Sequence, residues 1–238
     1  MSTEPPIGSC LSGLLLLVAG LLFPDFAWAK SCTPPENTAA IKVNLVEGNL
    51  AYNTAEPLKM LTRRMRRNED AGVKSIYSFG LTSVEWRSKA DMQLAGMPVG
   101  AASYCWYVTE ISMTIETHST IFLAKEIARD SCIWREVMNH EQKHVKLNRI
   151  LFGRLKDDLK PKIAAVAEGG IETSDGDAAM AVFRPKIEKT IDTVLEKFSA
   201  AREKRHRAEI DTEAEYDRVD AACTETEWDA IYRRAGLK

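Results

Sequence analysis

Residues 105–117 read CWYVTEISMTIET and contain the clearest strand pattern in the chain. Every second residue from Cys105 to Ile115 falls on one face, and Ile111 and Met113 lie on it. A period of two with β-branched and aromatic residues predicts a strand. After this stretch, the spacing of apolar residues changes to that of helices and stays so. The sequence therefore predicts an α+β fold, in which a small antiparallel sheet precedes two long helices packed together.

The β-rich part is expected over residues 40–117. Alternating apolar residues predict its strands, and Pro57 at a first-turn position followed by helical spacing predicts one short amphipathic helix. The expected elements are strands over 40–52, 73–86 and 105–117, a helix over 56–68 and a turn over 96–102.

The helical part is expected over residues 120–238. Asp130 or Ser131 can cap a first helix that extends to Lys160, where Pro161 should kink or restart it. A loop rich in Gly, Asp and Ser follows over residues 169–177. The second long helix is expected from about Ala178 or Arg184 to Ala221, with Ile187, Ile191, Val194, Phe198 and Ala201 as its buried stripe.

The composition is that of a globular protein. The 238 residues are 45% apolar and 28% charged, with a formal net charge of -2. These fractions exclude collagen-like, low-complexity and globally disordered chains. The near-neutral balance also argues against a nucleic-acid partner, because affinity for phosphate requires an excess of Lys and Arg.

The first 29 residues have the features of a cleaved export signal. Residues 11–23 (LSGLLLLVAGLLF) form an apolar run that is too short for a membrane-spanning helix, and Ala27-Trp28-Ala29 provides small residues at a cleavage site. The segment lacks Lys and Arg, so a misassigned start or an uncleaved anchor stays an alternative. Cleavage after Ala29 leaves one domain over 30–238, periplasmic or secreted, with no stable membrane insertion.

Four cysteines remain in residues 30–238: Cys32, Cys105, Cys132 and Cys223. An even number of cysteines in an exported chain predicts two disulfides, for which three connectivities are possible. We expect the pairs Cys105–Cys132 and Cys32–Cys223, the first joining a strand to the following helix and the second joining the two ends of the chain. Reduced, buried cysteines are the alternative.

Residues 140–144 read HEQKH, an H-E-x-x-H motif inside the first predicted long helix. Residues four apart lie on one helix face, so His140 and His144 can bind one Zn²⁺ ion. Glu141 is then placed to act as general base on the water that zinc activates. The alternative is a solvent-facing helix on which two histidines happen to lie one turn apart. Lys143 departs from the uncharged residues usual inside this motif.

A catalytic zinc site requires a third protein ligand and one open position. No His follows the motif at metzincin spacing, so the ligand should come from the second long helix. Its candidates there are His206, Glu209, Glu213, Asp217 and Asp220. His118, at the end of the strong strand, is expected to be a surface turn residue.

Several of these features together resemble a bacterial domain-of-unknown-function family described as secreted zinc-dependent proteases. The residues that carry the resemblance are Tyr52, the helix start at 54–61, Trp86, the strand over 105–115, the helix over 134–145 with HEQKH, and Tyr216-Asp217. The resemblance implies a zincin-like domain, and it selects Asp217 as the third metal ligand. In the family, Tyr-Asp-x-x-Thr and His-Gly are usual, whereas Asp220 replaces the Thr here and no His-Gly follows.

The leading hypothesis is therefore an exported zinc metallopeptidase. Its strand over 111–115 would bind an extended peptide or protein substrate of the cell envelope. The alternative is a non-catalytic exported helical hairpin that binds an envelope partner, in which the His pair is incidental or structural. A structure in which His140 and His144 point to open solvent would favour that alternative.

Overall fold

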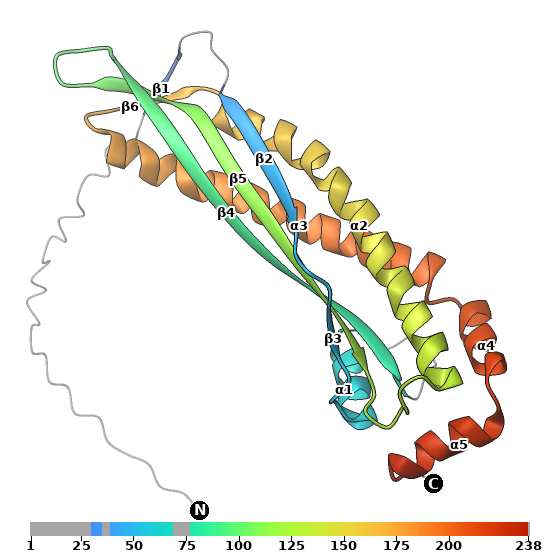
Figure 1. Ribbon diagram of the computed structural model, residues 1–238. Coiled ribbons are helices and arrows are strands. Elements are labelled where there is room, and N and C mark those ends of the chain that lie inside the picture. The colour runs from blue at the N-terminus through green and yellow to red at the C-terminus, as the bar shows by residue number, and fades with distance from the viewer. Residues whose placement is uncertain (1–29, 35–38, 69–76, 238) are drawn as a thin grey trace, which may run out of the picture.

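A computed structural model describes residues 30–34, 39–68 and 77–237 (Figure 1). The predicted export signal over residues 1–29 lies outside the described residues. Within these ranges, no helix has the length and hydropathy that a membrane span requires.

One long strand organises a mixed sheet. This strand is β5 (Tyr104–Leu123), and β4 (Gly80–Pro98) pairs with it antiparallel along its whole length. The other side of β5 pairs in succession with three short strands, and a fourth strand extends the sheet at one end. They are β6 (Gly170–Thr173, antiparallel to β5), β2 (Ala40–Glu47) and β3 (Ala51–Asn53), both parallel to β5, and β1 (Lys30–Cys32), which pairs antiparallel with β6.

The prediction of an antiparallel sheet was therefore wrong for β2 and β3. The chain leaves β3 through α1 (Leu58–Asn68) and enters β4, which lies on the far side of β5. The β4–β5 hairpin then reverses the chain, so that β5 lies between β4 on one side and β2 and β3 on the other and is parallel to β2. A hairpin thus supplies the crossover that parallel pairing requires.

Two long helices, α2 (Cys132–Ala167) and α3 (Gly176–Glu209), pack against each other and extend beside the long strands (Figure 1). Ile111 and Ile115 of β5 lie in one core with Leu155 and Leu159 of α2 and Ile191 of α3. These residues are at most 4% exposed, which confirms these parts of the predicted faces. Two predicted positions differ: Ala201 of α3 is exposed, and so is Thr109, where a register shift between β4 and β5 buries Val108 instead. The helix α2 continues past Pro161 to Ala167.

The second long helix ends earlier than its apolar pattern predicted. The helix α3 stops at Glu209, and α4 (Glu213–Ala222) and α5 (Glu225–Arg234) follow as separate short helices. The cause lies in Thr212, whose side chain accepts a hydrogen bond from the backbone of Glu215 and caps α4. The turn between α3 and α4 therefore begins a new helix and leaves Asp211 outside both.

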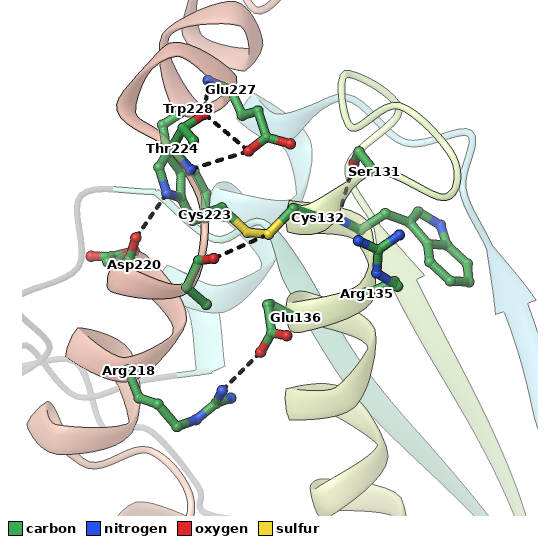
Figure 2. The surroundings of a disulfide bond; sticks show 12 residues. Ser131, Cys132, Arg135, Glu136, Arg218, Asp220, Cys223, Thr224, Glu227 and Trp228 are labelled. Carbon is green, nitrogen blue, oxygen red and sulfur yellow. Dashed lines mark hydrogen bonds and ion pairs between the residues drawn. A yellow bond between two sulfur atoms is a disulfide. The ribbon is translucent and has the colours of Figure 1, made fainter.

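Both disulfides form, but with a different pairing from the one expected. Cys32 is joined to Cys105, and Cys132 is joined to Cys223 (Figure 2). Cys105 lies near the start of β5, and the strand extends about 60 Å from there before α2 begins. Cys105 and Cys132 thus lie at opposite ends of the strand and cannot be bridged. Two disulfides are typical of proteins outside the reducing cytosol.

Candidate metal centre

The HEQKH segment lies inside α2, whose start is capped by the side chain of Ser131. His140 and His144 are only 7% and 9% exposed, whereas Gln142 and Lys143 face solvent. The two Nε2 atoms lie 3.2 Å apart. The helical spacing has thus brought both imidazoles to one buried point.

Asp211, in the turn between α3 and α4, completes the group. Its Oδ1 lies 3.4 Å from Nε2 of His140 and 3.0 Å from Nε2 of His144. Two ligands of a tetrahedral zinc ion, each about 2.0–2.1 Å from the metal, are about 3.3–3.4 Å apart. The three atoms therefore form a triangle that fits one face of a zinc tetrahedron, and the remaining vertex is left for a fourth ligand. These residues could hold a metal ion.

The structure brings Asp211, and not the expected Asp217, to the His pair. Asp217 lies on an exposed position of α4 and is not among the residues that could hold a metal together with the histidines. A sequence signal for the true turn was present, since Thr212 followed by Glu215 has the Ser/Thr-x-x-Glu spacing of a helix start. The prediction of one continuous helix to Ala221 concealed the helix start at Thr212, and with it the position of the Asp211 carboxylate just before that start.

The other candidate ligands have different surroundings. Glu209 forms an exposed ion pair with Arg205, and Asp220 lies on the exposed side of α4. His118 is partly buried inside β5, which continues to Leu123, and its Nε2 lies 3.0 Å from Glu116. It does not end the strand as expected. The fourth histidine, His206, contacts His144 instead of the candidate metal position.

Glu141 is buried beside the triangle and contacts the sheet. It is 4% exposed, and Thr82 of β4 donates a hydrogen bond from Oγ1 to its Oε2 at 2.7 Å. Burial raises the pKa of Glu141, and the nearby histidines and Thr82 only partly oppose this. A carboxylate whose pKa is moved toward neutrality is a stronger base than a solvated one.

The strand at this point allows close approach because Gly80 has no side chain. A Cβ at Gly80 would lie 2.6 Å from Oε1 of Glu141 and 2.6 Å from Cγ1 of Val137. Only glycine therefore lets β4 pass beside the carboxylate without displacing it.

The charge state of the triangle follows from its contacts. Burial opposes ionisation of Asp211, but hydrogen bonds from both histidines outweigh it and hold the pKa of Asp211 well below its usual range. Burial likewise opposes protonation of His140, but the carboxylates of Asp211, Glu141 and Glu215 together outweigh it and raise the pKa of His140. Tyr216 also donates a hydrogen bond from its hydroxyl to Oδ1 of Asp211 at 3.2 Å. The carboxylate is therefore ionised and oriented toward the histidines.

Lys143, the unusual residue of the motif, has a partner that faces the same site. Its Nζ lies 2.6 Å from Oε1 of Glu215, and this oxygen is 3.5 Å from Nδ1 of His140. Arg218 binds the same carboxylate, and together with Lys143 it lowers the pKa of Glu215 to about 2. Lys143 thus fastens α4 to α2 next to the first histidine.

The second histidine has its own line of contacts. Nδ1 of His144 is hydrogen-bonded to Nδ1 of His206 on α3, and Nε2 of His206 lies 2.8 Å from Oδ1 of Asn148 on α2. Burial lowers the pKa of His206 to about 4, so this imidazole is neutral at pH 7.

Comparison with protein-family models, with curated proteins and with solved structures yields no match for this chain. The resemblance to secreted zinc-dependent proteases therefore stays a prediction, and the function has to be argued from the site.

Proposed function

We propose that this protein is an exported zinc-dependent metallopeptidase, periplasmic or secreted. The observation that carries the proposal is the triangle of Nε2 of His140, Nε2 of His144 and Oδ1 of Asp211, whose sides of 3.0–3.4 Å match those of a zinc tetrahedron. Two imidazoles and one carboxylate are also the ligand set of several zinc peptidases.

The residues around the triangle have distinct tasks. Zinc, when bound, supplies Lewis-acid activation of a water molecule and of a carbonyl group. Glu141 accepts the proton of the attacking water and returns it to the leaving amine. Its raised pKa suits both steps, and the hydrogen bond from Thr82 holds its carboxylate in place.

The substrate strand needs a different place from the one expected. The stretch 111–115 lies in β5, which is paired with β2 on one side and β4 on the other, so its backbone groups have no capacity for a peptide. Among the described residues, no strand pairs with the outer edge of β4. We place an extended peptide at this edge, because Thr82 of β4 touches the catalytic carboxylate.

The hydrogen-bond ladder indicates which backbone groups are available there. The amide of Ala124 donates to the carbonyl of Phe79, so these two residues form a hydrogen-bonded pair. In an antiparallel ladder such pairs alternate, and the amides and carbonyls of Thr82 and Val84 therefore point outward. The carbonyl of Gly80 follows the same rule, since it accepts from the hydroxyl of Ser78 instead of from β5.

The alternative of a non-catalytic binding module has less support. His140 and His144 pointing to open solvent, away from the second helix, would have favoured it. Both are buried, and both face Asp211 just beyond the end of α3. Incidental histidines on a solvated helix would not converge with a carboxylate in this way.

The test is the zinc content of the protein purified without chelators, measured by elemental analysis. We expect about one equivalent for the wild type and for Asp217→Asn, and less than a tenth of an equivalent for Asp211→Asn. Equal zinc in both Asp variants would contradict the assignment of Asp211. Glu141→Gln should keep its zinc and lose peptide hydrolysis by at least a hundredfold. Zinc-loaded protein whose hydrolysis is unaffected by Glu141→Gln would refute the mechanism.

A further inference from the structure

The structure assigns His206 and Asn148 as positioning residues of the candidate zinc site. They hold a hydrogen on Nδ1 of His144, so that Nε2, the nitrogen facing Asp211, is the one that can bind the metal. This inference rests on the proposed zinc site, but one of its tests needs no metal.

The three residues form a continuous line between two helices. His144 and Asn148 lie one turn apart on α2, and His206 of α3 lies between them, with its ring plane within 8° of that of His144 and 4.7 Å between centroids. Nδ1 of His206 contacts Nδ1 of His144, and Nε2 of His206 contacts Oδ1 of Asn148. Asn148 is 6% exposed, so water does not compete freely for its side chain.

The positions of the hydrogens on His206 and His144 follow from the guanidinium of Arg202, which can only donate hydrogen bonds. Arg202 directs Nη1 toward Oδ1 of Asn148 at 3.5 Å, and a guanidinium has only donors, so this atom of Asn148 is the amide oxygen. An amide oxygen accepts, and Nε2 of His206 must therefore carry the hydrogen. Neutral His206 then has its lone pair on Nδ1, which accepts a hydrogen bond from Nδ1 of His144.

The consequence reaches the metal position. With one hydrogen held on Nδ1, His144 can give up the hydrogen that Nε2 donates to Oδ1 of Asp211, 3.0 Å away, and Nε2 can then bind a metal. Without an acceptor at Nδ1, neutral His144 would keep its hydrogen on Nε2, where Asp211 accepts it, and that tautomer cannot bind a metal there. Residues that orient a metal-binding histidine in this way typically contribute 10–100-fold to metal affinity.

The same contacts distinguish His206 from a metal ligand. Both of its ring nitrogens are engaged, one by His144 and one by Asn148. It is also absent from the group of His140, His144 and Asp211 that could hold an ion. Its effect on zinc should therefore be moderate and should depend on its ability to accept a hydrogen bond.

The first measurement uses the wild-type protein without metal. Nitrogen-15 NMR of its histidine side chains at about pH 8 should show His206 protonated at Nε2 and not at Nδ1, and should show a proton on Nδ1 of His144. A His206 protonated at Nδ1, or a His144 without a proton on Nδ1, would overturn the inference, and this result does not depend on whether the protein binds zinc.

The second measurement is zinc affinity, by competition with a chelating indicator. His206→Phe keeps an aromatic ring but removes the acceptor, and we expect a 10–100-fold loss of affinity; His206→Gln restores an acceptor and should recover at least part of it. His118→Phe, in β5, is the matched control and should leave the affinity unchanged.

Two outcomes of this second measurement contradict the assignment. Affinity of His206→Phe within threefold of the wild type would mean that the line of contacts does not act on the metal. A loss beyond a thousandfold would mean that His206 is itself a ligand. Failure of the wild type to bind zinc would refute the proposed function, and the proton on Nδ1 of His144 would still decide whether the line of contacts exists.

Discussion

The disulfide between Cys132 and Cys223 joins the first residue of α2 to the residue that follows α4 (Figure 2). Asp211 lies just before α4, and two residues of α4, Glu215 and Tyr216, contact the candidate metal centre. We predict that the double variant Cys132→Ser/Cys223→Ser binds zinc at least tenfold more weakly than the wild type.

The magnitude follows from what would hold α4 without the disulfide. The bridge closes a separation of 91 residues, and loss of a bridge of this span destabilises a protein by up to about 4–5 kcal/mol in the chain-entropy model. The ion pairs of Arg218 with Glu136 and of Lys143 with Glu215 remain, and partly exposed pairs contribute about 0.2–1 kcal/mol each. Apparent zinc affinity falls in proportion to the population in which α4 is docked, and a tenfold fall corresponds to about 1.4 kcal/mol.

The second disulfide offers a matched control. Cys32–Cys105 closes a separation of 73 residues, so its loss should lower the free energy of unfolding by a similar 4–5 kcal/mol at most. It joins β1 to the start of β5, however, about 50 Å along the strand from Ile121, which pairs with Thr82 beside the site. Cys32→Ser/Cys105→Ser should therefore lose stability and keep its zinc affinity.

Urea unfolding and chelator competition, measured on both double variants, separate the two effects. The expected result is a comparable loss of stability in both and a loss of zinc affinity only in Cys132→Ser/Cys223→Ser. Equal zinc affinities in the two variants would show that the disulfide does not position Asp211, and the reasoning would be wrong.

Further predictions concern pH and two glycines. Zinc affinity should fall about tenfold per pH unit below the raised pKa of His140, because protons compete for its nitrogen. In the metal-free protein the same raised pKa acts on stability with the opposite sign. The ion pair of His140 with Asp211 stabilises the fold below about pH 6.5 and is lost as the pH rises through the pKa of His140 in the folded state. The midpoint temperature of thermal unfolding should therefore fall as the pH rises through that pKa. Gly80→Ala should displace Glu141 and abolish hydrolysis with zinc retained, as activity and elemental analysis of one preparation can show. Gly153→Ala, an exposed position of α2 with free space around the new Cβ, should instead raise the free energy of unfolding by about 0.5–1 kcal/mol in urea titrations.

Local patterns predicted part of the elements, because each element depends on neighbours in the chain, but β6 lies within the predicted loop over 169–177 and β4 extends to Pro98, into the predicted turn. The alternation over residues 105–117 marked a strand, although the strand continues to Leu123, and the helical spacing from Ser131 marked α2. The pair His140 and His144 converges because a helix always brings residues four apart to one face. These features needed no knowledge of the rest of the fold.

Pairing between distant segments was not accessible in the same way. Parallel pairing of β2 with β5 depends on the β4–β5 hairpin entering from the far side, and the cysteine pairing depends on the length of β5. Neither the strand pairing nor the cysteine pairing produces a periodic pattern in the sequence. Four cysteines allowed three connectivities, and only their positions in space selected one.

The sequence by itself determined that this chain is an α+β protein with two cysteine pairs and two histidines on one helix face. The tertiary structure alone decided that Asp211 meets them, because helix α3 ends at Glu209 and the turn before Thr212 leads the chain back over α2. A ligand set is made by atoms a few ångströms apart, whereas Asp211 lies 67 positions after His144 in the sequence. The physical reason is that helical geometry acts over neighbouring residues and places the two histidines, whereas the third corner of the triangle, Asp211, is placed by the packing of α3 and α4 on α2.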